Sequence, residues 1–163
     1  MLVAALGCAW WMEKSTRFLQ LPPAPHYTGR ELDLAIMGRG YFMVTNSDNQ
    51  TLYTRHGRLA LNASGDLCLA KPDDKWLIEP PIKAYHEAVA IEINNDGTIL
   101  MRCSHSDRPG DVGQLQLATF INPDGLTEVS PGLYATSADS GGPCVSCPDQ
   151  NGAGTIRQFW LEK

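Results

Sequence analysis

Two cysteines three residues apart come closest, by residue type and spacing, to a recognisable chemistry. Cys144 and Cys147 form a CxxC pair in GGPCVSCPDQ, which suits a zinc clip or a tight disulfide. Zinc needs two further ligands, and only Cys68, Cys103 and His105 remain as candidates. No helical pattern follows the pair, which argues against a thioredoxin-type redox site. We expect a structural or incidental role, with metal binding by Cys144 and Cys147 as the alternative.

A serine in a protease-like context is the second candidate for chemistry. Ser140 lies in ADSGGP, which is similar to the sequence around the nucleophile of chymotrypsin-like proteases. That mechanism needs a histidine base and a buried aspartate in a much longer, two-barrel fold. The histidines have neither the context nor the spacing of such a base, so we expect no catalytic residue and no cofactor. They are His26, His56, His86 and His105.

The amino-acid composition limits which partners the chain is expected to bind. The net charge of −5 and the pI near 5.2 argue against nucleic acid, which selects clustered Lys and Arg. No apolar run is long enough for a membrane-spanning helix, so we expect no membrane insertion. Residues 1–12, MLVAALGCAWWM, lack the basic start of a secretory signal. Their structure is left open: an apolar strand, a frayed helix or a remnant of something longer all fit, with a lipid anchor at Cys8 as the minor alternative.

The elements that would position such residues are short strands. Strand patterns recur every 8 to 12 residues from residue 32 onward, and no sustained helical stripe occurs. The sequence predicts an all-β fold of short antiparallel strands in a twisted sheet, a sandwich or a partly open barrel, with long glycine-rich loops. Strands are expected at 41–46, 51–55, 58–62, 67–70, 88–94, 98–103, from 113 to the turn at 122–125, at 132–137 and at 155–163.

Local patterns add detail to this fold. Val89, Ile91 and Ile93 alternate and are expected on one side of their strand, and the NDG at 95–97 predicts a hairpin. Residues 138–155 show no periodicity and are expected to form a flexible loop. The predicted organisation is an apolar start and proline-containing connector at 1–31, followed by a β-rich domain at 32–163.

Two polar residues stand close to predicted core positions. Asp33 lies between Leu32 and Leu34, and Arg55 follows a strand. A polar group near a core needs a partner. We expect either an Asp33–Arg55 pair or Asp33 accepting backbone N–H groups at a turn, with an interface role as secondary.

Six blocks in fixed order give the chain a family resemblance: LDLAIMGRGYFMV, YTRHGRLALNASGDL, INNDGTI, VGQLQLATFINPDGL, GLYATSADSGGP and GAGTIRQFWLE. Together they resemble the bacterial flagellar basal-body rod and hook family, and most of all its distal-rod members. The resemblance runs from about Thr16 to Glu162. It implies a non-enzymatic structural subunit whose β-rich core packs beside neighbouring subunits. The matching structural and turn positions are Asp33, Gly38, Gly40, Arg55, Gly57, Gly97, Gly113, Gly125 and Gly141.

The same resemblance implies partners and a location. We expect self-association or association with other rod and hook subunits in the flagellar basal body, outside the cytoplasm. Asn122, Pro123 and Trp160 are candidate interface residues, and Trp160 could share a cluster with Trp10 and Trp11. A soluble periplasmic accessory or binding module derived from the same fold is the alternative function.

Departures from the family pattern qualify the resemblance. Family members begin and end with helical segments that drive polymerisation, whereas this sequence has no such pattern at either end. We expect a core fragment or a short homologue that is monomeric in solution. The CxxC is unusual for the family, and Phe159-Trp160 stands where the family tends to have a glycine followed by an aromatic residue.

Overall fold

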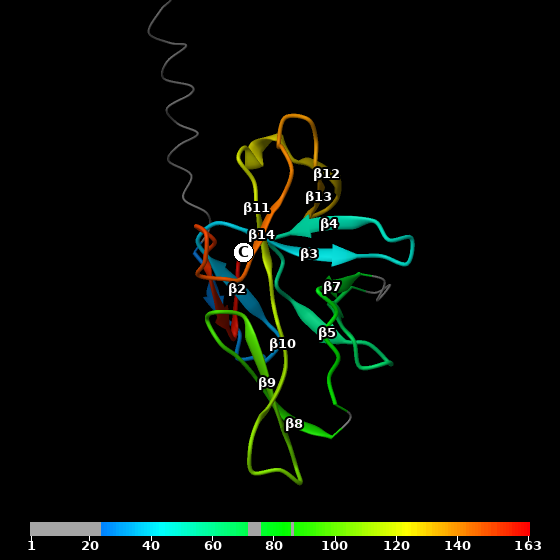
Figure 1. The fold of residues 1–163 in the computed structure, drawn as a ribbon, viewed down its shortest axis with the longest axis vertical. Helices are drawn as coiled ribbons and strands as arrows, with labels where there is room; N and C mark the ends of the chain where they lie inside the picture. Colours follow the sequence, from blue (N-terminus) through cyan, green and yellow to red (C-terminus); the bar gives the residue numbers. More distant parts are fainter. Residues whose placement is uncertain (1–23, 72–75, 86) are drawn as a thin grey trace, which may run out of the picture.

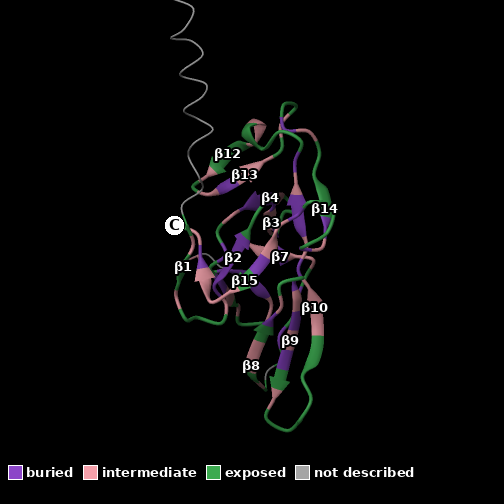
Figure 2. Cartoon of the chain, turned by 90° about the vertical axis from the view of Figure 1, so that its left-hand side faces the viewer, coloured by how far each residue is buried: buried purple, intermediate pink, exposed green. Residues whose placement is uncertain are grey.

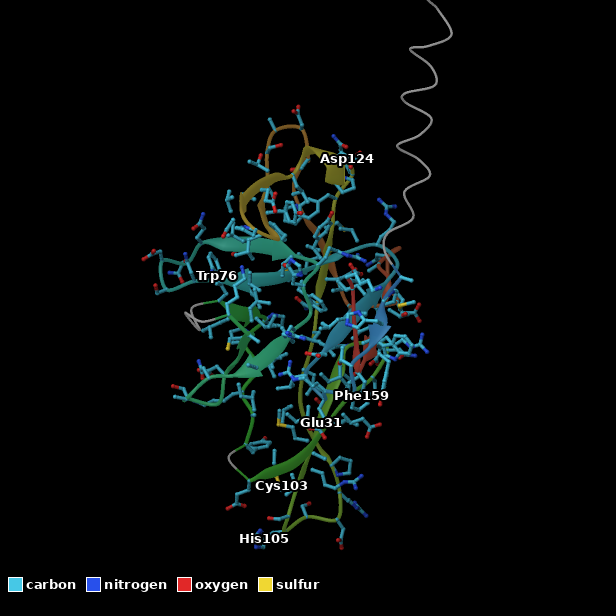
Figure 3. The ribbon with its side chains drawn as sticks, turned by 180° about the vertical axis from the view of Figure 1, so that it is seen from behind. Glu31, Trp76, Cys103, His105, Asp124 and Phe159 are labelled. Atoms are coloured by element: carbon cyan, nitrogen blue, oxygen red, sulfur yellow. The ribbon has the colours of Figure 1, made fainter. Side chains whose placement is uncertain are left out.

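The computed structural model describes residues 24–71, 76–85 and 87–163. These residues form an elongated molecule made of strands, with Asp124 near one end and His105 at the other (Figures 1 and 3). Every strand pairing within them is antiparallel, and the only helical element described is the single 3-10 turn η2 (Pro123–Gly125). The predicted all-β class is confirmed. No helix in these ranges is long and apolar enough to cross a membrane.

The largest sheet has nine strands and is organised around β3 (Tyr41–Thr45). The order is β12-β13-β4-β3-β7-β6-β5, and β11 pairs with both β3 and the edge strand β14. Alternation along β3 gives this sheet two apolar faces, because Phe42 and Val44 join the main core while Tyr41 and Met43 face a smaller aromatic cluster. The other strands are β4 (Thr51–Thr54), β5 (Leu59–Leu61), β6 (Leu67–Leu69), β7 (Leu77–Glu79), β11 (Leu117–Thr119), β12 (Thr127–Ser130), β13 (Leu133–Ala135) and β14 (Cys144–Ser146).

A three-stranded sheet forms the end of the molecule near His105 (Figures 1 and 3). It comprises β8 (Ala88–Ile93), β9 (Thr98–Cys103) and β10 (Gly110–Gln114) in the order β10-β9-β8. The predicted NDG hairpin is confirmed: β8 pairs with β9, and the N–H of Gly97 bonds to the Asn94 carbonyl at 3.0 Å. Gly97 has φ +84°, a left-handed conformation that glycine adopts without strain.

One register prediction in this sheet is wrong. Val89 does not share a buried side with Ile93, since it is 62% exposed whereas Ile93 is 5% exposed. The pairing with β9 shifts between Ala88 and Ala90, which marks a β-bulge. A bulge inserts one residue and redirects the side chains beside it, so simple alternation fails here.

Two small sheets bring the first and last described strands together. β2 (Leu34–Met37) pairs with β15 (Thr155–Gln158), and β1 (His26–Tyr27) pairs with β16 (Trp160–Leu161). β1 lies within the segment expected to be a connector. The domain boundary at residue 32 stays a prediction.

Buried residues run through the middle of the molecule, and exposed segments concentrate in loops and at its ends (Figure 2). The main core extends from the large sheet into the three-stranded sheet, where it includes Ile99 and Met101. The loop expected at 138–155 is only partly irregular, because β14 lies inside it and pairs with β11. Three residues, Cys-Val-Ser, are too short to show alternation, so this edge strand carries no sequence signal.

Candidate functional site

The side chain of Arg55 joins three parts of the chain at the end of β4. Its guanidinium donates to the carbonyl groups of Ile36 at 3.1 Å, Gly38 at 2.9 Å and Gly40 at 2.6 Å. It also pairs with Glu162, where Nε to Oε2 is 3.0 Å and Nη2 contacts Oε1. Arg55 thereby ties the β2–β3 connection and the C-terminal segment to the central sheet. A planar fork of five donors suits this task, and a lysine could not reproduce it.

A groove of about 340 Å³ lies beside this arginine on the aromatic face of the central sheet. Its floor and walls combine glycine backbone with aromatic rings, and Arg39 donates weakly to the Phe120 carbonyl at 3.4 Å. The η2 turn borders it through Pro123. The lining residues are Gly38, Arg39, Gly40, Tyr41, Arg55, Thr119, Phe120, Pro123 and Glu162.

Edge-to-face aromatic contacts hold the groove's inner wall. The Tyr41 ring centroid lies 5.8 Å from that of Phe120 and 6.2 Å from that of Tyr134, and the Tyr53 centroid lies 4.9 Å from Phe120. Arg55 stands 5.9 Å from the Tyr41 centroid. Such ring pairs favour a fixed wall geometry beyond the area they bury.

Burial governs the electrostatics of this cluster. Loss of solvent raises the pKa of Tyr41 above its ordinary value of 10.0, Arg55 opposes the rise, and Tyr134, Asp124 and Glu162 add to it. Burial, with Glu79 second, also raises the pKa of Tyr53. Both phenols therefore stay protonated at neutral pH, and neither is poised as a general base.

Asp33 occupies a second polar site near the same C-terminal segment. Its side chain is 0% exposed, with Oδ1 2.8 Å from Arg30 Nη1 and 3.9 Å from Arg58 Nε. Oδ2 has no hydrogen-bond partner among the described residues. The Asp33 carbonyl accepts the N–H of Phe159 at 2.8 Å, so this site also anchors the last strands.

The expected Asp33–Arg55 pair is wrong. Each residue has other partners: Asp33 contacts Arg30 and Arg58, and Arg55 binds Glu162. The alternative, in which the carboxylate accepts turn N–H groups, does not form either, because its recorded partners are guanidinium groups. Glu162 was missed because it lies 107 residues away in sequence, and no local pattern links such distant positions.

Between the two polar sites, Gly57 permits a close backbone approach. A Cβ at this position would lie 1.8 Å from the Leu34 carbonyl oxygen, and the Leu34 N–H bonds to the Gly57 carbonyl at 2.9 Å. No side chain larger than hydrogen fits there without moving β2. The functional roles expected for the other turn glycines stay predictions.

Phe159 joins β15 to β16 in a left-handed conformation, φ +70°. Its carbonyl accepts the N–H of Thr28 at 2.7 Å, and its ring centroid lies 6.5 Å from that of Tyr27. The same patch contains Trp160, whose ring lies 5.7 Å from Tyr27 and 4.3 Å from the Arg157 guanidinium. The expected contact of this tryptophan with Trp10 and Trp11 lies outside the described residues.

The CxxC pair is spread along a strand. Cys144 is exposed on β14, and Cys147 follows the strand and is half-buried. Three residues of extended chain span roughly 10 Å between Cα atoms, which exceeds the separation a disulfide bridges. Across residues 24–71, 76–85 and 87–163, no group of three or more His, Cys, Asp or Glu side chains gathers as a metal site.

The remaining candidates lie near the η2 end. Ser140 is buried, and its hydroxyl accepts the Ser137 N–H at 2.9 Å and lies 3.0 Å from the Ser137 carbonyl, so it serves a local turn. Asn122 donates from its side chain to the Asp139 carbonyl at 3.0 Å. Pro123 is exposed and lines the groove.

Comparison with known proteins identifies the family of this chain. Residues 35–101 match the family model described as "Flagellar hook protein FlgE/F/G D1 domain". The chain belongs to the flagellar rod and hook protein family.

Within that family, the chain is similar to proteins named flagellar basal-body rod protein FlgG. It is 33% identical over 138 residues to the one from Caulobacter vibrioides, covering 85% of this chain and 52% of the relative. It is 34% identical to the one from Agrobacterium fabrum, covering 83% of this chain and 50% of the relative. It is also 34% identical to the one from Bacillus subtilis, covering 85% of this chain and 53% of the relative. The chain thus spans about half the length of these curated relatives.

Proposed function

We propose that this chain provides the β-rich core of a structural subunit of the flagellar basal-body rod, similar to the distal rod. The observation that carries the proposal is the 33% identity to a basal-body rod protein across 85% of the chain. The function is mechanical: a rigid domain packs against neighbouring axial subunits in the basal body, outside the cytoplasm.

The architecture supports a mechanical role. A continuous core runs from the large sheet into the three-stranded sheet, so the two ends of the long axis are connected by close packing. The first and last described strands pair as β1 and β16, and Arg55 fixes the C-terminal segment to the central sheet. Force applied at these strands would therefore reach the core through the β1–β16 pairing and the Arg55–Glu162 contact.

Complementation tests the proposal. A strain lacking its distal-rod gene receives this chain alone, or a chimaera in which this chain replaces the matching core of the strain's own rod protein. The intact rod protein serves as the positive control, and the chimaera with Gly57→Ala as the negative control. We expect purified basal bodies to contain the chimaera and swimming to be restored at least partly.

Failure of the stably produced, folded chimaera to enter basal bodies would contradict the structural role. In that case the accessory-module alternative predicts that the chain occurs in the periplasm without co-purifying with rods.

A further inference from the structure

The groove beside Arg55 is a preformed cavity that the described side chains leave open. Its volume of about 340 Å³ is near the lower end of sites that hold small organic groups. Arg55 is already engaged with Glu162 and three carbonyls, so it has little capacity for a further ligand. Arg39 is different, because it is exposed and, among the described residues, its guanidinium makes a single long hydrogen bond, to the Phe120 carbonyl. The groove therefore offers aromatic walls and one available cation.

A patch of complementary character lies on β8 and the residues just before it. Tyr85 is 56% exposed and Val89 is 62% exposed, and the Ala88 N–H bonds to the Tyr85 carbonyl in the turn that leads into β8. Glu87 lies between them in sequence, and its side chain is 70% exposed and has the exposed His105 as its ion-pair neighbour. The bulge at Ala88–Ala90 is what turns Val89 away from the core. Bulges that redirect a side chain occur often next to functional sites.

The groove extends from the middle of the molecule, where β3 and the C-terminal segment lie, to the η2 end, whereas this patch lies toward the other end (Figure 1). Pro123 borders the groove and precedes Asp124, whereas Glu87 lies 3.8 Å from His105. Figure 3 shows Asp124 and His105 at opposite ends of the molecule. A patch cannot reach the groove of its own chain, but it can reach the groove of a second copy. A contact between two different surfaces repeats without closing unless its rotation forms a ring.

We infer that the groove receives the Tyr85, Glu87 and Val89 patch of a second copy of this chain, with Glu87 pairing with Arg39. The apolar side chains of the patch cover Tyr41 and Phe120, and the charge pair sets the orientation at the rim. This inference rests on the proposed structural function and specifies the two surfaces through which copies would pack together.

Charge exchange between copies tests the contact. Self-association of the reduced full chain is measured by sedimentation up to about 1 mM, with concentration-dependent amide shifts recorded for both surfaces. Arg39→Glu and Glu87→Arg are each expected to weaken association about fivefold, because each creates a like-charge contact. Glu31→Arg is the matched control at an exposed position outside both surfaces and should leave association unchanged.

A mixture of the two single variants gives the decisive result. The glutamate introduced at position 39 of one variant would meet the arginine introduced at position 87 of the other. The unchanged Arg39 would likewise meet the unchanged Glu87, so association should return to the unmodified strength. The double variant should associate normally by itself. Val89→Lys, which places a charge in the apolar contact, should weaken association about tenfold or more.

Three outcomes would overturn the inference. The chain could show no self-association at the highest concentration, or both charge reversals could leave association unchanged. The single variants could also associate more weakly without the mixture restoring the association. Melting curves of every variant verify that the fold is retained. The proposed function is judged separately by entry of the chimaera into basal bodies. A chimaera that enters them while the reversals have no effect would refute this contact and leave the structural role intact.

Discussion

The Arg55 and Asp33 sites hold the same C-terminal segment in contrasting ways. Arg55 satisfies carbonyl groups of the β2–β3 connection and a carboxylate that is 15% exposed. Asp33 is fully buried, yet one carboxylate oxygen has no partner among the described residues, and its cations are at least half exposed. Burial alone therefore does not measure how much a polar residue stabilises a fold. The number of groups that would lose a partner is the better guide.

The largest expected effect comes from Arg55→Ala. Three carbonyl oxygens and Glu162 would lose their donor, so the free energy of unfolding should fall by about 3 kcal/mol. Urea unfolding monitored by tryptophan fluorescence measures it. Arg55→Lys is the control and should recover part of the loss, since it keeps the charge but cannot reach all acceptors. If Arg55→Ala and the unmodified chain had equal free energies of unfolding, Arg55 would not be the more stabilising of the two sites.

The next largest effect concerns Phe159, whose N–H donates to the carbonyl of Asp33. Its left-handed backbone, φ +70°, favours glycine over any residue with a Cβ. Phe159→Gly and Phe159→Ala both remove the ring, so their difference isolates the backbone. We expect the glycine variant to be more stable than the alanine variant by about 1 kcal/mol. A more stable alanine variant in thermal melts would show that the conformation carries no strain.

Asp33→Asn should have a smaller effect. The substitution keeps the shape and removes a buried charge whose second oxygen lacks a donor among the described residues, while losing an ion pair with the half-exposed Arg30. These changes offset each other, and we expect less than about 1 kcal/mol in the free energy of unfolding. A loss larger than that of Arg55→Ala would reverse the ranking of the two sites and point to an ordered water or ion on Oδ2.

Tyr41→Phe gives the smallest effect, confined to alkaline pH. The folded pKa of Tyr41 is raised above 10.0, so the folded state holds the phenolic proton more tightly than the unfolded state. The resulting stability is complete below pH 10.0 and is lost as pH rises through the folded pKa. Tyr41→Phe should therefore lose less stability than the unmodified chain above that pH. Tyr85→Phe, at an exposed position, is the control, and identical alkaline profiles for Tyr41→Phe and the unmodified chain would contradict the burial effect.

Much of the fold could be predicted from local pattern. The alternation in 41–46, 51–55 and 98–103 predicted β3, β4 and β9, and NDG predicted the β8–β9 turn, because side-chain periodicity and turn chemistry act over a few residues. Short edge elements such as β14 were missed, and the bulge misdirected Val89. Both depend on which neighbouring strand is present.

The candidate site was less predictable. Four lining residues were singled out from the sequence, namely Gly38, Gly40, Arg55 and Pro123. The groove itself was not predicted, since Thr119 and Phe120 reach it from β11 and the residue that follows it. No sequence pattern indicates that residues far apart along the chain enclose a cavity. The family resemblance supplied the proposed role, and the structure supplied the surfaces on which the role can be tested.

The sequence by itself determined the strand-rich class, the family and the turns, because these follow from side-chain size, alternation and backbone preference over short distances. Only the tertiary structure decided the partners of Arg55 and Asp33, the exposure of Val89 and the strained backbone of Phe159. Those features depend on contacts between residues as many as 131 positions apart, as between Thr28 and Phe159. Such contacts are set by how the sheets pack around one core, which no short stretch of chain specifies.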